Sequence, residues 1–241
     1  FFLLMFIIVG LTNGFSVITG QRFGAKDYDG VRRSGVVSVI LSTVITLIFT
    51  TISTLLMKQF LVLMIVPDEI FNDAFWYIQI FTLGLIITTF YNLLASIIRA
   101  LGDSLTPLYC LILASVINVL LALLFIIKFH WGVPGSAVAV LISQAISAIL
   151  CLYYIKIKFP ILNLKLSDWN FNLKTDWQFA LQHLKLGFPM AIQFAIIGAG
   201  ILIIQSACNS FGPDLIASFT AALRIEQIAT LPFISFGVAL S

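Results

Sequence analysis

Long stretches without a charged residue divide this sequence at regular intervals. Six of them contain no Asp, Glu, Lys or Arg: 1–21, 34–57, 74–98, 104–127, 131–155 and 186–213. Each is at least as long as the roughly 20 apolar residues that a helix needs to cross the core of a bilayer. A seventh stretch, 215–241, contains Arg224 and Glu226 as its only charged residues. The pattern predicts about seven membrane spans in this chain.

The pattern within each stretch distinguishes helices from strands. A membrane β-barrel shows segments of about ten residues that alternate between apolar and polar. Runs such as 36–41, Val-Val-Ser-Val-Ile-Leu, are instead apolar at nearly every position. A lone spanning segment must also satisfy its backbone hydrogen bonds internally, which a helix does. We therefore expect an all-α polytopic integral membrane protein.

Composition and charge exclude several other classes of protein. Hydrophobic residues make up 61% of the 241 residues and charged residues only 10%, against about 25% charged residues in soluble domains. The net charge of +3 is small and scattered, so we expect no nucleic-acid surface. Cys110, Cys151 and Cys208 each lie inside an apolar run, so neither a disulfide framework nor a metal site is expected. The first residue is not Met and lies within an apolar run, which indicates a fragment.

The basic residues predict which connectors face the cytoplasm. Ten of the 13 Lys and Arg residues lie in the first, third and fifth connectors, at 22–33, 99–103 and 156–185. The connectors on the other side hold Lys58 and Lys128. Because cytoplasmic loops carry the excess of Lys and Arg, we expect these three connectors to be cytoplasmic in a multi-pass protein of the plasma membrane.

The long fifth connector indicates a division into two lobes. We expect a partial N-terminal lobe at 1–155, a cytoplasmic linker at 156–185 and the start of a C-terminal lobe at 186–241. The linker places apolar residues at helical spacing, which predicts an interfacial amphipathic helix, at Leu173, Trp177, Leu181 and Leu184. Residues 6–12 and 233–239 share Phe, Ile and Gly, as parallel repeats in transporters do.

Two shorter connectors carry local signals. Thr106 precedes Pro107, and this order predicts a helix capped by Thr106 with Pro107 in its first turn. Only a few residues separate the fourth and fifth spans, around 129–131. These two spans are therefore expected to form a tight helical hairpin.

Five runs of residues, in content and order, resemble the multidrug and toxic compound extrusion (MATE) family. They are Gly20–Tyr28, Arg99–Pro107, Trp131–Gln144, Leu186–Met190 and Arg224–Gln227. The resemblance covers essentially the whole chain. It implies that the chain runs from the second to the eighth helix of a twelve-helix protein with two six-helix lobes.

The resemblance also implies a function. MATE proteins are secondary active antiporters, not enzymes, and they expel organic, often cationic, compounds in exchange for H⁺ or Na⁺. The expected partners are small organic substrates, H⁺ or Na⁺ and membrane lipids, with no nucleic acid. We expect a monomer that needs no cofactor beyond the ion gradient.

Two residues are candidates for coupling to the cation. Glu226 is a carboxylate within a predicted span, where ionisable groups are costly and functional by default. Asn118 matches the first position of an Asn-x-x-x-Asp pattern that is common in the family, but Ala122 occupies the second. Ile197 stands where some members have a carboxylate, so the coupling ion stays open.

Four further polar residues at membrane depth are candidates for lining a substrate cavity: Gln193, Arg224, Gln144 and Asn92. Gln193 lies one turn after Pro189, which frees backbone carbonyls in a helix. For any of these residues, the alternative is a hydrogen bond between helices that only stabilises packing.

Two other functions are weighed against export. A lipid-linked oligosaccharide flippase of the same superfamily would need a more highly charged cavity. A polytopic membrane enzyme would need a nucleophile, a base and an orienting group at one site, whereas His130 and His183 lie on opposite sides of the predicted membrane.

The predicted topology can be tested by cysteine labelling of the full-length protein. Ser167→Cys should react with a membrane-impermeant maleimide only from the cytoplasm, and Asn72→Cys only from outside, because their connectors fall on opposite sides. The reverse pattern would contradict both the orientation and the lobe assignment.

Overall fold

The computed structural model describes residues 2–63, 68–162 and 173–209, with short helical pieces between 218 and 233. Within these described residues the regular elements are helices, which confirms the all-α fold. The chain divides into two units, 1–196 and 197–241. The first unit holds every element discussed below except the end of the last helix.

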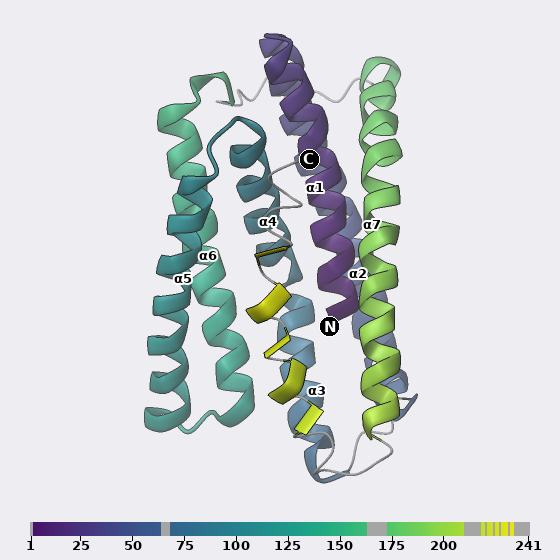
Figure 1. Ribbon diagram of the computed structural model, residues 1–241, viewed down its shortest axis with the longest axis vertical. Coiled ribbons are helices and arrows are strands. Elements are labelled where there is room, and N and C mark those ends of the chain that lie inside the picture. The colour runs from purple at the N-terminus through teal and green to yellow at the C-terminus, as the bar shows by residue number, and fades with distance from the viewer. Residues whose placement is uncertain are drawn as a thin grey trace. The chain divides into compact units, whose positions relative to one another are not determined.

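The helices follow the predicted spans closely (Figure 1). They are α1 (Phe2–Gly24), α2 (Tyr28–Leu63), α3 (Asp68–Leu83), α4 (Leu85–Ala100), α5 (Leu105–Leu123), a π-helical turn (Leu124–Lys128), α6 (Gly132–Lys158), a 3₁₀ turn (Pro160–Leu162) and α7 (Leu173–Asn209). Among the described residues, five helices are long and apolar enough to cross a membrane, and α3 with α4 adds a sixth if this bent pair is counted as one span. The seventh predicted span, 215–241, lies largely outside the described residues.

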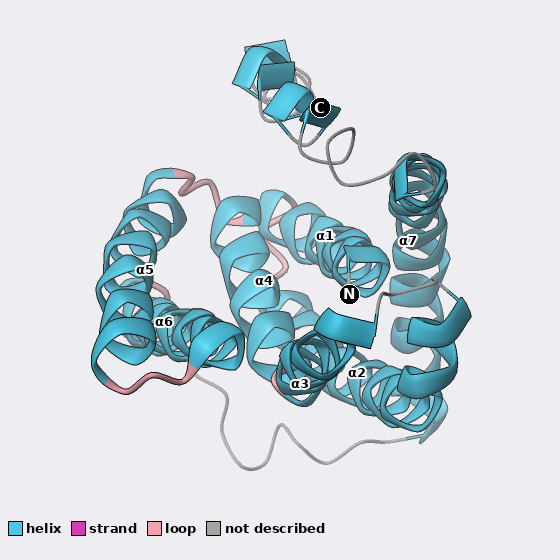
Figure 2. Ribbon diagram, turned by 90° about the horizontal axis from the view of Figure 1, so that it is seen from below, coloured by secondary structure: helices cyan, strands magenta, loops and turns pink. Residues whose placement is uncertain are grey.

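Helix α4 lies in the middle of the first unit and packs against α1, α2 and α6 (Figure 2). Six consecutive residues of α4, from Leu93 to Ile98, are buried, so this helix is covered on all sides there. Small polar residues join it to its neighbours: the Thr46 and Thr89 hydroxyls lie 2.9 Å apart. Hydrogen bonds of this kind help spanning helices to associate where water is absent.

A glycine accounts for the bend between α3 and α4. The two helices meet at Gly84 with an angle of 49° between them. The Leu141 side chain of α6 fills the space beside Gly84, where an added Cβ would lie 2.3 Å from it. The missing side chain therefore lets α6 pack directly against the bend.

The start of α5 differs from the prediction that Thr106 caps it. The Asp103 carboxylate accepts hydrogen bonds from the backbone N–H groups of Leu105 and Thr106, both at 3.0 Å. The Thr106 hydroxyl donates to the same carboxylate at 2.7 Å. A hydrogen bond donated by the Tyr154 hydroxyl, together with the hydrogen bonds from Thr106 and Leu105, lowers the pKa of Asp103 to about 2. The helix thus begins two residues earlier than Pro107, because an ionised Asp is an effective N-cap.

The tight hairpin between the fourth and fifth spans is confirmed. Only three residues, 129–131, separate the end of the π-helical turn from α6. His130 and Gly132 both adopt positive φ, at 55° and 59°. The Trp131 ring stacks on Phe125 with 5.0 Å between centroids, so the turn is packed by its own aromatic residues.

Helix α7 joins two segments that the sequence separates. The predicted linker helix and the span that follows it form one continuous helix from Leu173 to Asn209. Trp177 and Leu181, from the predicted apolar face, are exposed, whereas Asp176 and His183 are buried. In this part of α7, Asp176 and His183 therefore pack inward, whereas Trp177 and Leu181 face outward.

Candidate functional site

Small residues bring α1 and α7 into backbone contact. Gly10 and Gly14 of α1 lie one turn apart, as do Gly187 and Ala191 of α7. A Cβ added to Gly14 would lie 2.4 Å from the Gly187 Cα, and one added to Gly10 would lie 2.7 Å from the Ala191 Cα. Residues spaced by four share one helix face, and small residues at this spacing permit close crossings in membranes.

Next to this crossing, a buried hydrogen-bonded chain joins three helices. The His183 Nε2 of α7 lies 2.9 Å from the Ser34 Oγ of α2, which lies 2.9 Å from the Thr19 Oγ1 of α1. The His183 Nδ1 lies 2.7 Å from the Phe179 carbonyl, which can only accept, so Nδ1 carries a proton. In the neutral ring Nε2 then accepts from Ser34. The ring is fully buried, and the Phe15 ring meets it edge-on at 5.7 Å between centroids.

An ion pair ties α7 to the start of α2. The Arg33 guanidinium donates two hydrogen bonds to the Asp176 carboxylate, through Nε and Nη2. Asp176 is only 1% exposed, and a buried carboxylate needs such a partner because an unpaired charge there is costly. Asp176 and His183 are two turns apart on α7, so the pair and the His183 chain hold the same face.

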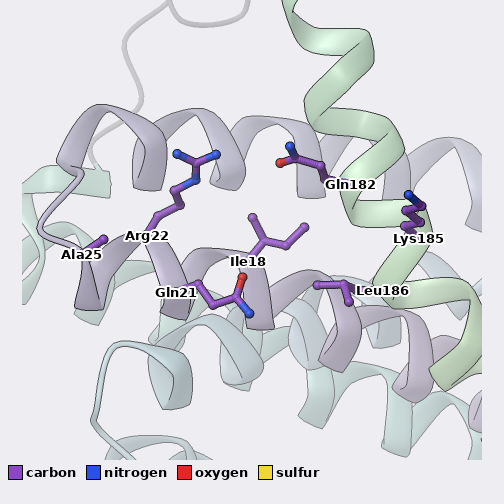
Figure 3. A pocket seen from close by; sticks show the side chains of 7 residues that line it. All are labelled: Ile18, Gln21, Arg22, Ala25, Gln182, Lys185 and Leu186. Carbon is purple, nitrogen blue, oxygen red and sulfur yellow. The ribbon is translucent and has the colours of Figure 1, made fainter.

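A cavity of about 540 Å³ lies between α1 and α7 at the same end of the helices (Figure 3). Arg22 and Lys185 supply the charged groups of its wall, Gln21 and Gln182 supply amides, and Ile18 and Leu186 are apolar. The Arg22 guanidinium also lies 2.9 Å from the Asp27 carboxylate and 5.1 Å from the centre of the Phe179 ring. A hydrogen bond from the Gly30 backbone N–H lowers the pKa of Asp27, and the hydrogen bond from Arg22 lowers it further.

Two of the predicted cavity residues meet at Thr88. The Thr88 hydroxyl of α4 donates to the Gln144 side-chain oxygen of α6 at 2.5 Å. The Asn92 amide donates to the Thr88 carbonyl at 2.8 Å, within α4. Gln144 therefore makes a bond between helices, the alternative considered above, whereas the bond of Asn92 stays within α4. Whether either residue lines a substrate route stays a prediction.

The other predicted site residues are not brought together in the described part of the chain. Asn118 of α5 is half-buried, and its amide nitrogen has no hydrogen-bond partner among the described residues. Gln193 is exposed on α7, Glu226 is exposed in the second unit, and Arg224 lies outside the described residues. Their assignment as coupling or cavity residues stays a prediction.

Sequence reasoning missed the buried polar face of α7. Asp176 and His183 were read as part of a linker, so their burial was not expected. A signal was present in the spacing: residues 176, 180, 183, 187 and 191 recur every three or four positions and are polar, small or Gly. In a helix that faces lipid, this is the stripe that packs against protein.

The sequence is similar to those of known proteins. The sequence model of the MatE family matches residues 1–124, slightly more than half of the chain. The chain is 32% identical over 234 residues to "Probable multidrug resistance protein YpnP" of Bacillus subtilis, which covers 97% of this chain and 51% of that protein. It is 22% identical over 248 residues to "Probable multidrug resistance protein NorM" of Thermotoga maritima, and this match covers 100% of this chain and 52% of that protein. The chain therefore spans about half the length of these curated relatives.

Solved transporters share its fold. An inward-facing structure of a multidrug resistance MATE family transporter matches with a TM-score of 0.85 and 24% identity, over 96% of this chain and 52% of that one. An outward-facing structure of such a transporter matches with a TM-score of 0.83, over 97% and 51%. The helix arrangement is thus that of about half of a MATE transporter.

The glycine crossing can be tested by adding one methyl group. Gly14→Ala should lower the free energy of unfolding of the full-length protein in detergent by about 1–3 kcal/mol, because the added Cβ overpacks against the α7 backbone. Gly24→Ala, on the same helix, is the control, since nothing lies within 4 Å of its added Cβ. Equal stability of the two variants would contradict backbone contact between α1 and α7.

Proposed function

This chain belongs to the MatE family, and on that premise we propose that the full-length protein is a secondary active antiporter. It exports hydrophobic, often cationic, organic compounds in exchange for H⁺ or Na⁺. The observation that carries the proposal is the 32% identity to a probable multidrug resistance protein over 97% of this chain. The chain is part of a multi-pass membrane protein, as such an exporter must be.

Coupling to a cation needs a group that binds or releases it inside the helices. Ionisable groups at that depth are costly and are candidates by default. Among the described residues, Asp176 and His183 are the buried acidic or basic side chains, and both lie near the start of the candidate span in α7. Asp176 is paired with Arg33, whereas His183 makes only neutral hydrogen bonds. We therefore add His183 to Glu226 and Asn118 as a candidate for coupling, with H⁺ as its ion.

His183 is also placed to convert protonation into movement. Its Nε2 accepts from Ser34 when the ring is neutral, and a proton on Nε2 would remove that acceptor. The Ser34 hydroxyl would then have to turn and accept instead, which changes its bond to Thr19 on α1. Protonation would thus alter contacts among α1, α2 and α7 together.

One observation favours a second function. The cavity between α1 and α7 has Arg22 and Lys185 in its wall and no acidic residue among its described lining. Such a cavity suits an anionic substrate better than a cationic one. A lipid-linked oligosaccharide flippase of the same superfamily is therefore kept as the alternative function.

Transport by the full-length protein separates these functions. In a drug-sensitive host, it should lower the accumulation of a fluorescent cationic dye, and a protonophore combined with a Na⁺ ionophore should abolish the effect, because an antiporter draws its energy from these gradients. Two variants test the coupling: Glu226→Gln and His183→Asn, which removes the titratable imidazole but keeps a donor near Phe179. Whichever residue carries coupling, its variant should lose gradient-driven export per folded molecule.

His130→Asn is the matched control, because His130 is an exposed histidine in the turn before α6 and Asn tolerates its positive φ. It should export normally. Dye export that persists without either gradient would contradict antiport. A lack of dye export by well-folded protein would favour the flippase. Normal export by a variant would remove its residue from coupling.

A further inference from the structure

The cavity between α1 and α7 combines cationic and apolar walls (Figure 3). Arg22 of α1 and Lys185 of α7 supply its positive charges, and Leu186, which is 39% exposed and adjacent to Lys185, supplies apolar surface. Its volume of about 540 Å³ is sufficient for a polar group together with part of a chain. Export of a cationic compound does not account for this combination.

The polar groups of the wall have unused capacity for hydrogen bonds. The ammonium of Lys185 and the amides of Gln21 and Gln182 have no hydrogen bond or ion pair in the described part of the chain. The Arg22 guanidinium donates one of its five N–H groups to Asp27, so four N–H donors remain for a ligand. Its side chain is 36% exposed, so these donors are accessible. An oxyanion with several acceptor atoms is the ligand that such a wall fits best.

The depth of the cavity in the membrane indicates where this anion comes from. Arg22 directly follows the charge-free stretch 1–21, and Lys185 directly precedes the charge-free stretch 186–213. Both bases therefore lie at the boundary between the apolar core and the headgroups, on the side where the basic connectors predict the cytoplasm. Basic pockets between spanning helices on this side bind anionic headgroups.

We propose that this cavity binds the phosphate of an anionic phospholipid. Arg22 and Lys185 contact the phosphate, Gln21 and Gln182 donate to its oxygens or to the glycerol, and an acyl chain lies along the exposed Leu186. The same walls repel a cationic drug, so this site is distinct from any site for a cationic substrate. Because the bound lipid contacts α1 and α7 together, it also stabilises their crossing. The proposed lipid site does not depend on which cationic compound the protein exports.

Binding of a fluorescently labelled phosphatidylglycerol tests the proposal. The full-length protein in a neutral detergent should bind this lipid and not the matched phosphatidylcholine, which carries no net charge. Lys185→Gln and Arg22→Gln should each weaken binding about fivefold, the contribution of one basic residue near an anionic surface. Arg22→Lys, which keeps the charge, should recover part of the affinity. Thermal unfolding without lipid should confirm that each variant is folded.

Lys158→Gln is the matched control, because Lys158 is an exposed lysine at the end of α6 on the same predicted side and does not line the cavity. It should bind like the unaltered protein. An equal loss in Lys158→Gln and Lys185→Gln, or equal binding of the two lipids, would overturn the site. Inorganic phosphate at millimolar concentration should not displace the lipid. Displacement would overturn the lipid assignment in favour of a soluble anion.

Discussion

The crossing of α1 and α7 depends on the absence of side chains at Gly10, Gly14 and Gly187. The two backbones touch there, and this contact brings the inner face of α7 against α1 and α2. The Phe15 ring, which is fully buried, lies directly over Gly187 and closes the crossing. Without this approach the His183 chain, the Asp176 ion pair and the walls of the cavity could not form.

The buried ionisable groups on α7 are stable only because each one has a partner. A buried carboxylate or imidazole without one would cost several kcal/mol in a membrane. Arg33 neutralises Asp176, and Ser34 satisfies His183, so adjacent residues of α2 serve both groups. Lys185, which is exposed on another side of α7, lies at the predicted headgroup boundary and lines the cavity. Packing, a candidate coupling group and a candidate lipid site thus share a single helix–helix contact.

The spans could be predicted from the sequence because a bilayer imposes one length and one polarity on every crossing helix. The hairpin before α6 followed from the short connector, and its three residues confirm it. The buried face at the start of α7 could not be predicted from its apolar stripe, because Asp176 and His183 are buried through their bonds to Arg33 and Ser34 of α2. Trp177 is exposed on the other side of the helix. The prediction that Thr106 caps α5 overlooked Asp103, which accepts from the first N–H groups of the helix and also from Tyr154 of α6, a contact that a local pattern does not contain.

A double-mutant cycle between Ser34 and His183 tests most directly whether the buried polar face of α7 is bonded to α2. The free energy of unfolding of the full-length protein would be measured in detergent for Ser34→Ala, His183→Asn and the double variant. If the hydroxyl and imidazole are bonded as described, the two effects should be non-additive by about 0.5–3 kcal/mol, as for residues in contact. Effects that add to within about 0.5 kcal/mol would contradict the bond and, with it, this account of how α7 is held.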